Sequence, residues 1–111
     1  MATIKSYTDI EQSKKLAEIL PIESADMYWW SSGKRYYIEA MDDGDFNEGE
    51  GHIRAWSLAA LLSVLPNYEI NNLGDGIQLG VNKEAFATEG DETLLDLVVN
   101  MIIHLNELKM L

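Results

Sequence analysis

The chain has 111 residues, 47% of them hydrophobic, and carries 19 acidic against 8 basic residues, for a net charge of −11. This length favours a single globular domain over residues 1–111, and the absence of cysteine excludes disulfides and thiolate-bound zinc. The excess of acids argues against direct binding of nucleic acid, because too few cations are present to displace the counterions of a phosphate backbone. No apolar run approaches the length of a membrane span, and no signal peptide is evident, so we expect a cytoplasmic protein that binds no membrane.

The first predicted element is a helix over residues 10–20. Thr8 and Glu11 have the spacing of a capping box at its start, and Pro21 ends it. Its apolar side chains recur at helical spacing, with charged side chains on the opposite side. This pattern indicates a surface helix with one buried stripe.

An aromatic hairpin is predicted next, over residues 27–30 and 35–40. Aromatic side chains suit strands, and Gly33 lies in the connecting turn, where a positive φ is favoured. Alternation along the second strand places Tyr36 and Ile38 on one face and Tyr37 on the other. We therefore expect a sheet with one covered face.

The same hairpin is a candidate partner-binding surface. Five aromatic side chains fall within ten positions: Tyr28, Trp29, Trp30, Tyr36 and Tyr37. If several face outward, they form a platform that stacks on a partner's side chain, a sugar or a base, and Tyr28, Trp30 and Tyr37 are the candidates. The alternative is that about half point into the core and the rest form cross-strand pairs.

The second half of the chain repeats the alternation of helix and strand pair. Residues 57–65 form a short helix capped by Ser57, and residues 68–70 and 77–81 form a second strand pair. A last helix runs over residues 91–108, with Asp91 as its cap. Apolar side chains fill about half of its circumference, so it is either wedged between a sheet and other helices or shared with a second chain.

These elements predict an α+β fold with the order α-β-β-α-β-β-α. We expect an antiparallel sheet of about four strands, with the three helices packed mainly on one face.

The acidic segment 41–51 is predicted to be a loop. Within it, Asp43, Asp45 and Asn47 have the alternating spacing of oxygen ligands that begins a calcium loop. The glycine expected at the sixth position and the acid expected at the twelfth are both missing, which excludes the standard helix-loop-helix site. An irregular calcium site is one interpretation, and a solvated run of charge is the other.

Three segments go beyond general patterning: residues 11–27 (EQSKKLAEILPIESADM), 56–66 (WSLAALLSVLP) and 99–108 (VNMIIHLNEL). Together they resemble small proteins of phages and mobile elements in gut Bacteroidetes. The resemblance covers most of the chain and is weakest over residues 28–54. It implies an origin in such elements and the cytoplasm of a bacterial host cell, and it implies no catalytic residue.

No enzyme motif is found. The chain has no glycine-rich phosphate loop and no serine elbow, and two histidines, His52 and His104, are too few for a structural zinc site. Apart from calcium, we expect no cofactor.

The leading hypothesis is a small non-enzymatic protein–protein interaction or assembly module of phage or mobile-element origin, binding a protein partner or a second copy. Homodimerisation through the last helix is its corollary. Two alternatives stay open: an acidic mimic of nucleic acid that inhibits a host DNA-binding protein, and a calcium-dependent binding module that uses the 42–50 loop.

Overall fold

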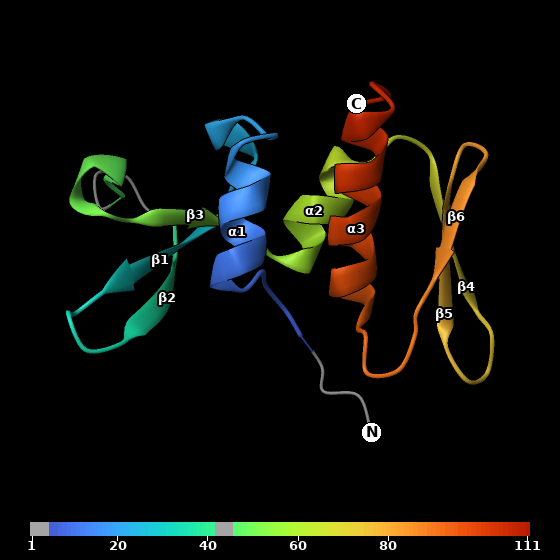
Figure 1. Cartoon of the computed structure of the whole chain (residues 1–111), viewed down its shortest axis with the longest axis horizontal. Helices are drawn as coiled ribbons and strands as arrows, with labels where there is room; N and C mark the ends of the chain where they lie inside the picture. Colours follow the sequence, from blue (N-terminus) through green and yellow to red (C-terminus); the bar gives the residue numbers. More distant parts are fainter. Residues whose placement is uncertain (1–4, 42–45) are drawn as a thin grey trace.

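A computed structural model describes residues 5–41 and 46–111 (Figure 1). Its elements, in chain order, are α1 (Ile10–Ala17), the 3-10 helix η1 (Ile22–Ser24), β1 (Met27–Ser31), β2 (Tyr36–Ala40), the 3-10 helix η2 (Glu48–Glu50), β3 (Ile53–Ala55), α2 (Leu58–Val64), β4 (Tyr68–Asn72), β5 (Ile77–Val81), β6 (Glu84–Ala87) and α3 (Leu94–Glu107). The α+β class and the predicted order of helices and strand pairs are confirmed. Each predicted strand pair is extended by one further strand that the sequence did not predict. These strands are β3 in the first half of the chain and β6 in the second.

The strands form two three-stranded antiparallel sheets, where the sequence predicted one sheet of about four strands. The strand order is β2-β1-β3 in the first sheet and β4-β5-β6 in the second. The helices lie between the sheets, with α1 beside the first sheet and α3 beside the second (Figure 1). The prediction of three helices on one face of one sheet is therefore wrong in this detail. A helix that is apolar over half of its circumference has to be covered on two sides, and a central helical layer provides this.

The core is one cluster of buried residues that runs from α1 through α2 and α3 to β5. Helix α3 contributes its largest share: Leu95, Leu97, Val98, Val99, Met101, Ile102 and Leu105 are all buried. The apolar surface of α3 is thus consumed within the chain, which corresponds to the wedged arrangement and removes the basis for dimerisation through this helix. Across residues 5–41 and 46–111, no helix has the length and apolar character that crossing a membrane requires.

The starts of two helices differ from the prediction. Asp9, not Thr8, caps α1, and its partner in the capping box is Gln12. Thr8 is fully buried and its hydroxyl accepts the backbone N–H of Trp56 at 3.1 Å, so a tertiary contact takes the group that would have capped the helix. Helix α3 is capped by Thr93, two residues after the predicted Asp91.

Other local predictions are confirmed. Ser57 caps α2, and its side chain accepts the N–H of Ala60. The first hairpin turns through Gly33, whose φ is +95°. The extra strand β6 follows a two-residue turn in which Asn82 has a φ of 57°, a conformation that asparagine tolerates.

Candidate functional site

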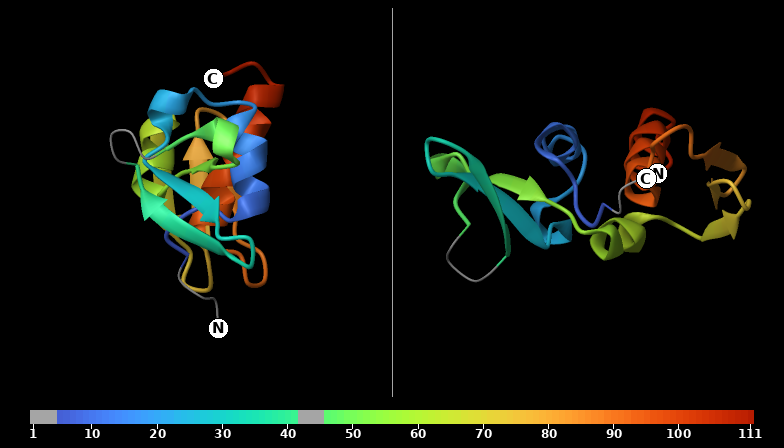
Figure 2. Two further views of the ribbon diagram at one scale, coloured as in Figure 1. Left: turned by 90° about the vertical axis from the view of Figure 1, so that its left-hand side faces the viewer. Right: turned by 90° about the horizontal axis from the view of Figure 1, so that it is seen from below.

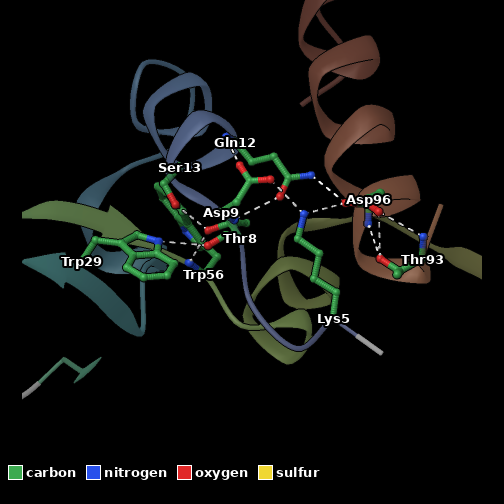
Figure 3. Close-up of polar contacts among 9 residues, drawn as sticks. All are labelled: Lys5, Thr8, Asp9, Gln12, Ser13, Trp29, Trp56, Thr93 and Asp96. Carbon is green, nitrogen blue, oxygen red and sulfur yellow. Dashed lines mark hydrogen bonds and ion pairs between the residues drawn. The ribbon is translucent and has the colours of Figure 1, made fainter. Parts of the chain in front are cut away.

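A cluster of polar side chains joins the start of α1 to the start of α3 (Figure 3). The Nζ atom of Lys5 lies 2.9 Å from an oxygen of Asp9 and 2.9 Å from an oxygen of Asp96. The side-chain amide of Gln12 donates to the same Asp96 oxygen at 2.8 Å. Asp96 also accepts the backbone N–H and the hydroxyl of Thr93, both at 3.0 Å. One carboxylate therefore receives donors from the N-terminal segment, from α1 and from its own helix.

These contacts shift the pKa values of the cluster in the directions that hold its charges. Partial burial alone raises the pKa of Asp96, but the hydrogen bonds from Lys5, Thr93 and Gln12 outweigh it and lower that pKa to about 2. The pKa of Lys5 is raised, because its bonds to Asp96 and Asp9 outweigh the opposing effect of burial. Lys5 is therefore held as a cation and Asp96 as an anion, which suits a structural ion pair and not a general base.

A second group of contacts continues the cluster toward the first sheet (Figure 3). The hydroxyls of Thr8 and Ser13 lie 2.7 Å apart and both residues are fully buried. The indole N–H of Trp29 donates to the carbonyl oxygen of Thr8 at 3.0 Å. Neither hydroxyl is an accessible nucleophile, so the cluster fastens α1 to the first sheet and to α3.

The predicted aromatic platform is only partly exposed. Tyr28 is 3% exposed, because its ring stacks on His52 at 5.1 Å and meets the edge of Phe46 at 5.7 Å. Tyr28 is therefore covered by its own chain, and its role in binding a partner stays a prediction. Trp30 is half-buried and stacks on its cross-strand neighbour Tyr37 at 4.7 Å, and Tyr37 is 37% exposed.

The outer face of the first sheet is thus mostly occupied by contacts within the chain. Arg35 lies over the exposed ring of Tyr37 at 5.5 Å from its centroid. The Trp30 indole nitrogen is buried and has no hydrogen-bond partner among the described residues. What remains outward is a small stack and not a broad platform.

Of the predicted calcium ligands, Asp43 and Asp45 lie outside the described residues. Asn47 caps η2, where its side-chain oxygen accepts the N–H of Gly49 at 3.0 Å and its backbone N–H donates to His52. Within the described ranges, no group of three or more acidic and histidine side chains is arranged to hold a metal ion. The calcium site stays a prediction.

His104 has a structural contact that the sequence did not reveal. Its Nε2 atom pairs with a carboxylate oxygen of Glu84, and its ring lies 5.1 Å from that of Phe86. Both partners belong to β6, a strand that the sequence pattern does not predict. This pair fastens α3 to the edge of the second sheet.

An open apolar surface lies on the other edge of that sheet. Along β4 every residue is exposed, and two large apolar side chains, Tyr68 and Ile70, are each 41% exposed. They pair with Val81 and Leu79 of β5, which are fully buried. Directly opposed residues of an antiparallel pair share a face, so Tyr68 and Ile70 lie on the face that is turned to the helices. Helix α3 packs against β5 and β6, and β4 extends beyond its cover.

Together with Leu73 of the following turn, which is 51% exposed, Tyr68 and Ile70 form what we call the β4 surface. The β4 strand also has no neighbour on its outer edge within the described part of the chain. Its backbone N–H and C=O groups on that edge are therefore open to another strand. The sequence did contain a signal, because the predicted strand at residues 68–70 has large apolar side chains at alternate positions.

The β4 surface belongs to a stretch of chain that is almost uncharged. Between Arg54 and Asp75 the chain has one charged residue, Glu69, although the whole chain carries −11. This stretch forms α2 and β4, which lie toward the same side of the molecule, opposite α1 and α3 (Figure 2, right). The stretch of chain that carries the β4 surface therefore holds only one of the protein's 19 acidic residues.

A second apolar region is a groove of about 480 Å³ where the C-terminal ends of all three helices meet. Its lining includes Ile19, Pro21, Val64, Pro66, Met110 and Leu111. Unlike the β4 surface, it presents no open strand edge.

Comparisons with protein-family models, with curated proteins and with solved structures found no match for this chain. Its function therefore has to be inferred from the geometry and chemistry of its own surface. The resemblance to proteins of phages and mobile elements stays a prediction from the sequence.

Proposed function

We propose that this protein is a small, non-enzymatic protein–protein interaction or assembly module, of phage or mobile-element origin. The observation that carries the proposal is the β4 surface, where an open strand edge and exposed apolar side chains occur together. Strand edges of this kind bind other chains by adding a strand, with backbone hydrogen bonds for affinity and alternate side chains for specificity.

The polar clusters support the non-enzymatic part of the same proposal. Lys5 and Asp96 neutralise each other, and His104 is paired with Glu84. Each of these groups links two elements of the fold and is already committed to a partner. The side chains that would be first candidates for acid–base chemistry thus have structural roles in the described part of the chain.

The proposal is tested by capture of partners from a lysate of cells that encode the protein. The wild-type chain is compared with Ile70→Lys, which places a charge on the β4 surface, and with the matched control Ile22→Lys. Ile22 is 45% exposed, close to the 41% of Ile70, but lies in η1, away from β4.

We expect quantitative mass spectrometry to find proteins that the wild type and Ile22→Lys retain and that Ile70→Lys loses by at least tenfold. Equal retention by all three chains, or no enrichment over an empty resin of either another protein or a second copy of the chain, contradicts the proposal. The nucleic-acid mimic and the calcium module stay predictions from the sequence, because no observation on the described residues favours either.

A further inference from the structure

We propose that β4 pairs with β4 of a second copy of this chain, antiparallel about Ile70, so that the second sheets of two copies join into one six-stranded sheet. The inference rests on the proposed function, since it names the partner of the β4 surface. Three observations carry it: the open edge, the register that the residues of β4 allow, and the distribution of charge.

The outer edge of β4 can accept a further strand. All five residues of β4 are exposed, and its only described neighbour is β5 on the other side. Native proteins commonly protect such edges with a charge on the inward face, a proline or a bulge. Here the strand itself contains no proline, and its single charge, Glu69, lies on the face opposite to Tyr68 and Ile70.

The sequence of β4 is compatible with pairing to itself. Antiparallel pairing about Ile70 is the one symmetric register that pairs all five residues, with Ile70 opposite Ile70, Glu69 opposite Asn71, and Tyr68 opposite Asn72. No like charges are directly opposed, and each Glu69 carboxylate faces an amide donor. Moving the centre by one residue toward the N-terminus would instead oppose Glu69 to Glu69.

This register also covers the exposed apolar side chains. Tyr68 and Ile70 share one face, and in the symmetric pair the two Ile70 side chains meet at the two-fold axis with a Tyr68 on the diagonal of each. The apolar strip of one copy thus continues into that of the other. The pairing satisfies the open backbone groups and the uncovered side chains in one step.

The charge distribution favours a second copy over a basic partner. A partner that is attracted by the acids of this chain would bind where those acids are, and the stretch that holds α2 and β4 has only Glu69 between Arg54 and Asp75. Two copies with −11 each repel one another across most of their surfaces. They approach with less repulsion through a strand that carries little charge, and β4 has only Glu69.

The first test is the oligomeric state of the purified chain by sedimentation velocity. We expect the wild type to show a concentration-dependent species of twice the 12.5 kDa monomer, and Ile70→Lys to weaken that association at least tenfold, because two ammonium groups then meet at the axis. Ile22→Lys is the control and stays dimeric. Circular dichroism shows whether each variant retains its fold. A wild type that stays monomeric up to millimolar concentration overturns the inference.

The second test determines the register in which the two copies of β4 pair. Because the chain has no cysteine, single-cysteine variants give an unambiguous cross-link. At the two-fold axis the two Cα atoms of opposed residues lie about 4.5–5.5 Å apart, within the reach of a disulfide. Under mild oxidation we expect Ile70→Cys to form a covalent dimer at least ten times faster than Ile22→Cys. Equal rates overturn the inference.

The two proposals fail separately. A monomeric chain whose captured partner is lost in Ile70→Lys keeps the interaction function and overturns self-pairing, because a strand of another protein then occupies β4. A monomeric chain that captures nothing contradicts both.

Discussion

The two sheets share one architecture and differ in how far the rest of the chain covers their apolar side chains. Each has three antiparallel strands and one face turned to the helical layer (Figure 1). In the first sheet, the outward Tyr28 of the central strand is covered by Phe46 and His52 and is 3% exposed. In the second, Ile70 is 41% exposed although it lies on the helix-facing side.

The comparison shows that strand alternation does not decide exposure by itself. A side chain on the inward face is buried only if a helix reaches the strand that carries it. Helix α3 packs on β5 and β6, so Leu79 is fully buried while its direct neighbour Ile70 is not. Conversely, the segment that includes Phe46 and His52 closes part of an outward face. An apolar edge that remains open after both effects is the natural place for a partner.

The largest expected effect on the free energy of unfolding concerns the covered part of the second sheet. Leu79→Ala removes a fully buried side chain, and we expect it to lower the free energy of unfolding by about 2–5 kcal/mol, since it leaves a cavity in the core. Ile70→Ala, at the paired position on β4, is expected to lower it by less than about 1 kcal/mol. Urea unfolding followed by circular dichroism measures both, at a concentration low enough to exclude self-association. Equal losses would contradict the difference in cover.

The next effect concerns the junction between the halves that carry the two sheets. Asp96→Asn removes the charge that binds Lys5 and Gln12, and we expect a loss of about 2 kcal/mol at pH 7, the free energy that corresponds to a pKa lowered from 3.8 to about 2. Asp91→Asn is the matched control, because Asp91 is exposed and precedes the same helix without capping it. It should change stability by less than about 0.5 kcal/mol.

The pH dependence of the same pair gives a second measurement. The folded pKa of Asp96 is lower than its ordinary value of 3.8, so its contribution is fully present above that pH and is lost as the pH falls toward the folded value of about 2. The wild type should therefore lose its advantage over Asp96→Asn across this range in acid unfolding. A difference between the two chains that stays constant down to pH 2 would argue against the ion pair.

The smallest effect compares two of the tryptophans that accompany the first sheet, Trp30 and Trp56. The indole N–H of Trp56 donates to Ser24 at 2.9 Å, whereas that of Trp30 is buried with no partner in the described ranges. We expect Trp56→Phe to lower the free energy of unfolding by about 1–2 kcal/mol and Trp30→Phe to change it by less than about 1 kcal/mol. Trp30→Phe also removes an unpaired buried donor. This change favours folding and offsets part of the stability that is lost with the buried area of the larger ring. The same urea titration ranks the two, and a larger loss for Trp30→Phe would contradict the assignment.

Local patterns in the sequence predicted most elements and missed the short ones. Helical spacing identified all three helices, and Ser57 identified the start of α2 correctly. Strands β3 and β6 have three and four residues, too few for alternation to stand out from chance. Because β6 was missed, Glu84 was missed as the partner of His104. Thr8 failed as a cap for a different reason, since the backbone of Trp56, far along the chain, takes its hydroxyl.

The candidate site divides in the same way. The near-absence of charge between Arg54 and Asp75 and the alternate apolar residues of β4 are legible in the sequence. That this strand is an edge strand outside the cover of α3 is not, because it depends on where a helix from the end of the chain packs. The aromatic side chains of the first hairpin illustrate the converse, since Tyr28 is in the pattern but is covered in the fold.

The sequence by itself determined the α+β class, the order of its elements and the broad apolar surface of α3, because these depend on periodicity within one segment. Only the tertiary structure decided that the strands separate into two sheets, that α3 is covered on two sides by its own chain, and that β4 is left open. Those outcomes depend on which distant segments compete for the same apolar surface, and a local pattern has no access to that competition.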